Sequence, residues 1–175
     1  MSILGVAMFF IGKVLIINAL WLGGKVETKD AGVFNVMVGT LAVLVALSYG
    51  LWSGSHDGHV VPLMAGLMLF AFTYVWVGIN ALRGAEDQRG LGYFCLLVAI
   101  ATIPFGYHAF LDGDMGWVFN WATYGILWFL FFMVLGVGST KAMPATIFMT
   151  WFVGITVWVT GWTYLYGYWP FGPNG

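Results

Sequence analysis

The chain has 175 residues, of which 61% are hydrophobic and only 7% are charged, with a formal net charge of −1. Soluble domains carry about 25% charged residues, so this composition excludes an ordinary soluble fold and indicates an integral membrane protein. The small net charge also argues against electrostatic binding to nucleic acid or to anionic lipid. Cys95 is the only cysteine, so no disulfide can form within the chain.

Six apolar segments are long enough to cross about 30 Å of hydrocarbon, which takes roughly 20 residues of helix. They are expected near residues 3–23, 32–52, 60–82, 91–110, 116–138 and 144–166. No charged region or small-residue cleavage site precedes the first segment, which is therefore expected to be retained and not cleaved as a signal peptide. The sequence predicts an all-α membrane protein, with residues 1–175 as a single domain of six transmembrane helices.

The positive charges predict the orientation in the membrane. Five of the six Lys and Arg residues lie in the first, third and fifth loops: Lys25, Lys29, Arg83, Arg89 and Lys141. The second and fourth loops carry none. Since positively charged loops stay in the cytoplasm, both termini are expected outside it.

The two halves of the chain resemble each other weakly. Residues 33–35 recur as residues 118–120, and residues 75–77 recur as residues 157–159. Because each half has three helices, the second half must enter the membrane from the opposite side. The pattern predicts two inverted three-helix repeats, a plan common in transport proteins; chance matches among Gly, Val and Trp are the alternative.

Catalytic groups are scarce in the predicted spans. No Asp, Glu or His is placed in the membrane interior, and Cys95 has no obvious base beside it, so acid–base and nucleophilic mechanisms lack their paired groups. The cluster of His56, Asp57 and His59 in the second loop is better explained as a solvated loop than as a metal site. We expect neither an enzyme nor a bound cofactor or metal.

An aromatic stripe runs along the fifth segment. Trp117, Trp121, Tyr124 and Trp128 recur at i, i+4, i+7 and i+11, which is the spacing of one helix face. Such a stripe can be packed core, a lipid-facing belt or the wall of a passage. Belts lie at the ends of a helix, whereas Tyr124 and Trp128 lie mid-span, where a hydroxyl or indole N–H needs a partner. The bundle interior or a passage is therefore favoured.

Other helices offer similar faces to such a passage. They comprise Leu4, Met8, Ile11 and Leu15 in the first segment, Phe70, Thr73 and Tyr74 in the third, and Trp151, Ile155, Trp158 and Trp162 in the sixth. An uncharged aromatic passage offers nothing to replace the hydration shell of an ion. A small, planar, neutral solute would pass between the rings, with its polar groups meeting Thr73, Tyr74, Tyr124 or an indole N–H.

Polar residues inside the spans need separate explanations. Four asparagines are expected to tie helices together, as amides at depth often do: Asn18, Asn35, Asn80 and Asn120. Lys13 is the one formal charge in the membrane interior. It points away from the Leu4–Leu15 face, so we expect it to face a neighbouring subunit or to extend toward the membrane surface.

These residues and motifs resemble the UreI/AmiS family of urea and short-chain amide channels. The likeness covers nearly the whole chain and is carried by residues 11–18, 34–39, 69–80, 98–104 and 125–128. The resemblance implies six helices per protomer, a urea path through each protomer and a homohexameric ring in a bacterial inner membrane. It implies membrane lipid around the ring and a cytoplasmic urease or amidase as client.

The family's path-lining positions are identified here by resemblance as Leu4, Met8, Ile11, Leu15, Phe70, Thr73, Tyr74, Trp117, Trp121, Leu127 and Trp128. Two positions depart from the pattern. Tyr124 stands where the family usually has a further tryptophan, and Phe152 or Val153 stands where better-known members carry a membrane-embedded glutamate. Thr150 or Thr156 would have to replace that polar group.

The acid-gated members have a long, histidine-rich loop between helices 2 and 3. Here that loop is short and holds His56 and His59, with His108 as a third candidate pH sensor. We therefore expect a channel for urea or small amides that responds only weakly to acid. The alternative hypothesis is a membrane scaffold that transports nothing and binds a partner through its aromatic faces.

Overall fold

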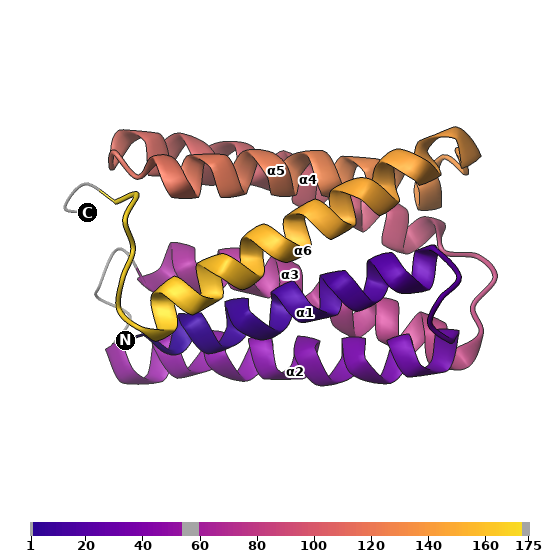
Figure 1. The fold of residues 1–175 in the computed structure, drawn as a ribbon, viewed down its shortest axis with the longest axis horizontal. Helices are drawn as coiled ribbons and strands as arrows, with labels where there is room; N and C mark the ends of the chain where they lie inside the picture. Colours follow the sequence, from indigo (N-terminus) through magenta and orange to yellow (C-terminus); the bar gives the residue numbers. More distant parts are fainter. Residues whose placement is uncertain (1, 54–59, 173–175) are drawn as a thin grey trace.

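Six antiparallel helices make up the computed structural model of the chain, which describes residues 2–53 and 60–172 (Figure 1). Their bounds are α1 Ile3–Leu22, α2 Thr28–Ser53, α3 Val60–Arg83, α4 Arg89–Leu111, α5 Met115–Phe131 and α6 Met143–Leu165. All six are long and apolar enough to cross a membrane. Each overlaps a predicted span, which confirms the six-helix all-α architecture.

Both ends of the chain lie at one end of the bundle, called here the terminal end (Figure 1). The α4–α5 loop lies there too, while the α1–α2, α3–α4 and α5–α6 loops lie at the opposite, loop end. The second three-helix half therefore starts at the loop end and runs inverted relative to the first. The helix contacts do not repeat between the two halves. The α2–α3 pair packs far more extensively than the corresponding α5–α6 pair, and the other extensive contacts are α1–α6 and α4–α5.

Glycines allow the closest helix pairs to approach. A Cβ at Gly12 would meet the backbone of Trp158, and one at Gly161 would meet the backbone of Phe9. Small residues at a helix interface let two membrane helices pack backbone to backbone. The contact between α1 and α6 therefore depends on these two glycines.

The fifth predicted span is not one regular helix. After α5 ends, residues Phe132–Gly136 form a π-helix (η1), and Thr140–Ala142 form a 3-10 helix (η2) before α6 begins. The π-helical turn packs closely on α4, since a Cβ at Gly92 would meet the backbone of Gly136. π-helical turns are frequent at functional sites, and this one lies at the loop end of the bundle.

Two of the expected amide ties are present between helices. Asn18 and Asn35 exchange reciprocal hydrogen bonds of 3.0 and 2.6 Å between α1 and α2. The Asn120 amide donates to the Thr160 hydroxyl of α6 at 3.3 Å. The expectation for Asn80 was wrong, because its side chain accepts a hydrogen bond from Arg83 of the same helix.

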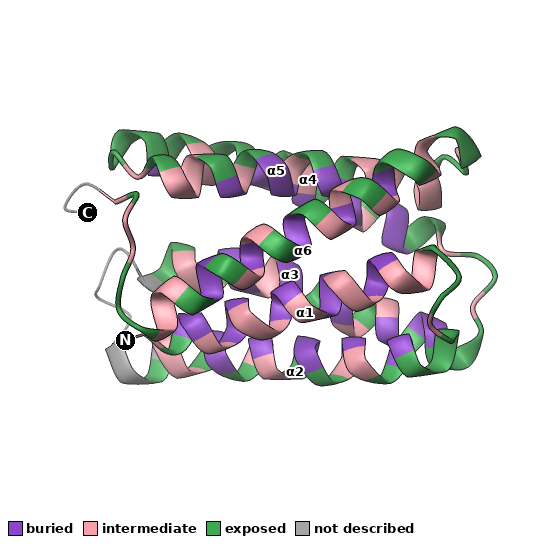
Figure 2. Cartoon of the chain, in the orientation of Figure 1, coloured by how far each residue is buried: buried purple, intermediate pink, exposed green. Residues whose placement is uncertain are grey.

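Large apolar side chains cover the outer surface, especially on α4 and α5, while buried residues face the bundle axis (Figure 2). A soluble bundle has a polar outer surface, whereas here both the core and the outer surface are apolar, as expected for helices that span a membrane. The buried faces of α1, α3 and α5 enclose the interior in which the candidate site lies.

Candidate functional site

The aromatic stripe of α5 faces α1 and α3 inside the bundle. Of the twelve side chains expected to line a passage, ten are buried, and Trp117 and Trp121 are partly buried. The buried ten are Leu4, Met8, Ile11, Leu15, Phe70, Thr73, Tyr74, Tyr124, Leu127 and Trp128. All twelve except Thr73 belong to one hydrophobic cluster or pack against it. The structure thus brings together side chains from three helices that are distant in sequence.

Phe70 lies at the centre of the aromatic contacts. Its ring centroid is 5.0 Å from that of Tyr124 and 4.8 Å from that of Trp128, and both contacts are edge-to-face. The Trp121 ring centroid is 6.1 Å from that of Phe70 and 5.6 Å from that of Tyr124. Edge-to-face contacts are a favoured geometry for aromatic rings. These rings therefore form a densely packed aromatic cluster in the middle of the bundle.

Two indole N–H groups of the stripe are already hydrogen-bonded within the protein. Trp128 Nε1 donates to Thr73 Oγ1 at 3.1 Å, and Trp117 Nε1 donates to the Tyr164 hydroxyl at 2.7 Å. The Thr73 hydroxyl in turn donates to the Leu69 carbonyl at 2.7 Å. A hydroxyl has only one proton to donate, so Thr73 and both indoles have no free donor for a solute.

Two other polar atoms in the cluster lack a protein partner. The hydroxyls of Tyr74 and Tyr124 are buried and make no hydrogen bond to any described residue, and the two residues are only 2% and 1% exposed. Buried polar groups are nearly always hydrogen-bonded, and each exception calls for an explanation. These two hydroxyls are therefore available to a small molecule in the bundle interior.

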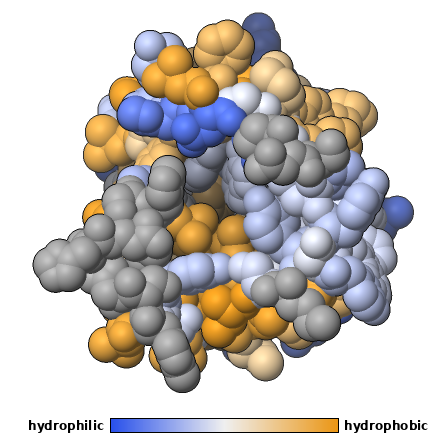
Figure 3. Space-filling view, turned by 90° about the vertical axis from the view of Figure 1, so that its left-hand side faces the viewer, coloured by the Kyte–Doolittle hydropathy of each residue, from blue (hydrophilic) through white to orange (hydrophobic). Residues whose placement is uncertain are grey.

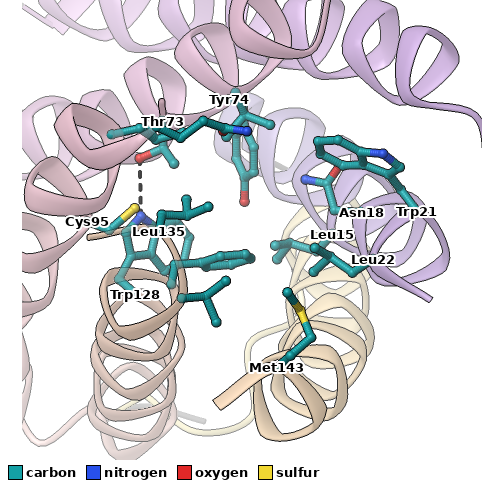
Figure 4. A pocket seen from close by; sticks show the side chains of 15 residues that line it. Leu15, Asn18, Trp21, Leu22, Thr73, Tyr74, Cys95, Trp128, Leu135 and Met143 are labelled. Carbon is teal, nitrogen blue, oxygen red and sulfur yellow. Dashed lines mark hydrogen bonds between the residues drawn. The ribbon is translucent and has the colours of Figure 1, made fainter. Parts of the chain in front are cut away.

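A cavity of about 240 Å³ lies between the aromatic cluster and the loop end (Figure 4). Its lining is mostly apolar and consists of Leu15, Asn18, Trp21, Leu22, Thr73, Tyr74, Val77, Gln88, Leu91, Cys95, Trp128, Phe131, Val134, Leu135 and Met143. Figure 4 shows the Tyr74 hydroxyl pointing into this space and the Trp128–Thr73 hydrogen bond at its edge. One water occupies about 30 Å³ in the liquid, so the cavity can hold a solute of several heavy atoms.

A second cavity, of about 700 Å³, lies between α3, α4 and α5 at the terminal end. It is lined by Val61, Pro62, Leu63, Ala65, Pro104, Phe105, His108, Ala109, Asp112, Asp114, Trp117 and Trp121. Figure 3 shows this end of the molecule hollowed near its centre, with hydrophobic side chains deep in the hollow. Trp121 lines this cavity and Trp128 lines the other, so Phe70 and Tyr124 lie between the two.

No charged side chain is among the twelve side chains expected to line the passage. The one salt bridge among the described residues is at the loop end, where Arg89 and Asp87 are 2.7 Å apart. Hydrogen bonds from Arg89 lower the pKa of the Asp87 carboxyl to about 2. Asp30 lies in the first turn of α2 and is also exposed at the loop end, outside the membrane interior as expected. The interior therefore offers dipoles and ring faces without formal charge.

Only half of the face expected for the sixth helix turns inward. Trp151 and Trp158 are half-buried, and the indole N–H of Trp158 is buried with no partner among the described residues. Ile155 and Trp162 are 49% and 41% exposed, and so lie on the outside of α6. The face turned inward carries smaller side chains, namely Thr146, Thr150, Val153, Val157 and Thr160. An apolar helix has no strong amphipathic direction, so the spacing of these residues did not separate the inward side of α6 from its outer side.

Phe152 and Val153, the two candidates for the position of the family's glutamate, differ in their burial on α6. Val153 is fully buried, whereas Phe152 is at the surface. Thr150 lies one turn away and is also fully buried, but its hydroxyl donates to the Thr146 carbonyl at 2.6 Å. Thr150 therefore retains only acceptor capacity.

The C-terminal residues form a contact that the sequence did not reveal. Trp169 donates its indole N–H to the Asp114 carboxylate at 2.8 Å and packs on Trp117 and Tyr164 at centroid distances of 6.1 and 5.2 Å. Asp114 also caps α5 by accepting from the backbone N–H of Trp117. The aromatic residues that follow α6 in the sequence were the feature from which this contact could have been predicted. Trp169 covers the terminal-end side of the stripe.

The candidate pH sensors are only partly placed by the structure. His56 and His59 lie outside the described residues. His108 is exposed on α4 and lines the terminal-end cavity with Asp112 and Asp114. Among the described residues, no group of three or more His, Cys, Asp and Glu side chains is placed to hold a metal ion.

Comparisons with known proteins give a consistent result. The family model described as "AmiS/UreI family transporter" matches residues 3–168. A protein of Mycolicibacterium smegmatis named as an amidate substrates transporter is 39% identical over 97% of this chain and 79% of its own length. The acid-activated urea channel of Helicobacter pylori is 29% identical over 95% and 99% of the two chains. The cryo-EM structure of the Helicobacter pylori urea channel in its closed state superposes with a TM-score of 0.82 at 27% identity, over 95% of this chain and 99% of that one.

Proposed function

This chain belongs to the AmiS/UreI transporter family, and we propose that it is a passive channel for urea or small neutral amides. Relatives named as an amidate substrates transporter and as a urea channel support this assignment. The observation that carries it is the pair of buried hydroxyls, Tyr74 and Tyr124, that have no protein partner beside the aromatic cluster. An unpaired polar group in an apolar interior is costly, so a pair of them is better explained by a solute than by the fold.

The chemistry of the aromatic cluster suits a planar amide. Each phenol hydroxyl can donate one hydrogen bond and accept others, so it can serve either the carbonyl or an N–H group of the solute. The flat faces of the solute would contact the rings of Phe70 and Trp128, which lie beside these hydroxyls. Ions gain nothing comparable, because no group there replaces their hydration shell.

The proposed path follows the order of residues along the stripe. A solute would enter at Trp117 and Trp121, pass Phe70 and Tyr124, and reach Tyr74 in the loop-end cavity. The apolar wall opposite the stripe would be made by the buried residues of α1, namely Leu4, Met8, Ile11 and Leu15. Trp128 would line the slit in a fixed orientation, because its N–H is held by Thr73, and Leu127 would back the slit from α5. Small side-chain movements at Phe70 would open and close the path at the aromatic cluster.

The cellular setting follows from charge and family. The described part of the chain is a multi-pass membrane protein, and the basic loop end would face the cytoplasm of a bacterial inner membrane, with both termini outside. We propose a homohexamer surrounded by membrane lipid, with a path in each protomer, supplying a cytoplasmic urease or amidase. Acid activation is expected to be weak.

Stopped-flow shrinkage of proteoliposomes tests the channel directly. The chain should raise the permeability to urea, acetamide or both well above that of empty liposomes, with no increase for sodium or chloride. Glycerol and water in the same panel define the selectivity. No increase for any amide would reject the proposal, and stable co-purification of a partner in that case would favour the scaffold.

A further inference from the structure

Lys13 lies at mid-span on the outer side of α1. It is ten residues beyond Ile3, about 15 Å from the terminal end of the helix. Its ammonium group sits 3.8 Å from the ring centroid of Phe9 and 5.1 Å from that of Phe10. These cation–π contacts hold the ammonium group about one helical turn closer to the terminal end than the Lys13 backbone. The group is still well below the membrane surface. An ammonium at this depth is costly without an acceptor.

No carboxylate is placed to serve as that acceptor. The acidic side chains of the described residues all lie at the two ends of the bundle or in its loops: Glu27, Asp30, Glu86, Asp87, Asp112 and Asp114. Lys13 makes no salt bridge or hydrogen bond with any described residue of its own chain. A second copy likewise has no acidic side chain at this depth in its described part, so the acceptor must be of another kind.

Helix α4 carries such an acceptor on its surface. Pro104 lies inside this helix, and proline has no N–H to donate to the carbonyl four residues earlier. The Ile100 carbonyl therefore lacks its helical donor. Ile100, Ile103 and Pro104 are exposed, with Ile103 at 70%, while Phe105 is partly buried. In lipid every backbone polar group needs a partner, so this carbonyl is a second unsatisfied group at mid-span.

The two unsatisfied groups match in depth and in chemistry. Ile100 precedes Leu111, the terminal end of α4, by eleven residues or about 16 Å, so it lies near the level of Lys13. We propose that copies of this chain assemble head to tail, with Lys13 of one protomer donating a hydrogen bond to the Ile100 carbonyl of the next. The two groups lie on different surfaces, since α1 packs against α2 and α6 while α4 packs against α5. Contacts between different surfaces generate a ring when the rotation between neighbouring copies closes, and an open filament when it does not. This contact deepens the proposed hexamer but does not depend on transport.

Disulfide cross-linking between differently tagged copies tests the contact. In a Cys95→Ala background, one copy carries Lys13→Cys and the other carries Ile103→Cys. Oxidation in the membrane should yield the mixed dimer. In the matched control, Leu44→Cys takes the place of Ile103→Cys, because Leu44 is 60% exposed on α2 at a similar depth. The proposal would be overturned if no mixed dimer formed, or if the control pair with Leu44→Cys gave the same yield of mixed dimer. Cross-linking between two copies of Lys13→Cys would also overturn it.

Assembly measurements give a second, independent readout. Lys13→Met removes the donor, and Pro104→Ala restores a backbone N–H to the Ile100 carbonyl. Each should raise the protein concentration for half-assembly in mild detergent about tenfold, as loss of one charge-assisted hydrogen bond predicts. The double variant should lose no more than either single variant. Unchanged assembly, or fully additive losses, would contradict the contact. A wild-type chain that cross-links as expected but conducts no amide would reject the channel and leave the contact standing.

Discussion

Replacing Tyr74 with phenylalanine tests whether the Tyr74 hydroxyl contributes to transport or to folding. The change removes one oxygen from a buried ring that contacts Trp128 at a centroid distance of 6.5 Å. Because the hydroxyl bonds to no described protein group, its loss breaks no internal hydrogen bond. We therefore expect Tyr74→Phe to fold normally, with a free energy of unfolding within about 1 kcal/mol of the wild type.

The effect on transport should be larger than the effect on folding. If the hydroxyl hydrogen-bonds a passing amide at the aromatic cluster, its loss costs about 0.5–1.5 kcal/mol of net interaction. Applied to the barrier for permeation, this corresponds to a loss of flux of about two- to twelvefold. Tyr124→Phe should behave in the same way, since its hydroxyl is also unpaired.

Thr73 offers a matched control with the opposite pattern. Thr73→Val is nearly the same size but removes the acceptor of the buried Trp128 N–H. Leaving that donor unsatisfied should lower stability by about 1–3 kcal/mol. Thr73→Ser keeps the hydroxyl and should restore most of the loss. The two positions are adjacent in α3, so a general sensitivity of this helix cannot explain a difference between them.

Thermal unfolding in detergent and stopped-flow amide flux in proteoliposomes measure both quantities on the same preparations. The reasoning is refuted if Tyr74→Phe is destabilised as strongly as Thr73→Val while its flux per folded protein equals that of the wild type. In that event the Tyr74 hydroxyl supports the fold and does not serve a solute.

Three further predictions address packing, access and pH. Gly12→Ala places a Cβ against the backbone of Trp158 and should destabilise the α1–α6 pair by about 1–3 kcal/mol; an unchanged melting temperature would contradict this. Mercuric chloride should inhibit flux by binding the Cys95 thiol in the loop-end cavity, and Cys95→Ala should be resistant, whereas equal inhibition of both proteins would place the block elsewhere. Flux should rise by less than about tenfold between neutral and mildly acidic pH; a larger rise that disappears when His56 and His59 are replaced would show acid gating.

The residues of the aromatic cluster were identifiable from spacing and from resemblance. Trp121, Tyr124 and Trp128 recur with the period of one helix face, and a period is a local property that the printed sequence already contains. Phe70 was proposed to face the same passage from the residues of the third segment, and the family likeness identified it again as a path-lining position. The hydrogen bonds among these groups could not be predicted from the spacing, because they join residues that are far apart in the sequence. Trp128 and Thr73, for example, are 55 residues apart.

Six membrane spans could be predicted from composition alone, because a run of about 20 apolar residues is long enough to cross the hydrocarbon of a membrane. The spacing of the stripe favoured an inward face for α5. The orientation of α6 and the packing of Trp169 over the stripe became visible in the three-dimensional structure. The tertiary structure also decided that the donors of Trp117, Trp128 and Thr73 are satisfied while the hydroxyls of Tyr74 and Tyr124 are free. The physical reason is that hydrogen-bond satisfaction depends on distances of about 3 Å between groups on different helices, and composition and periodicity do not specify such distances.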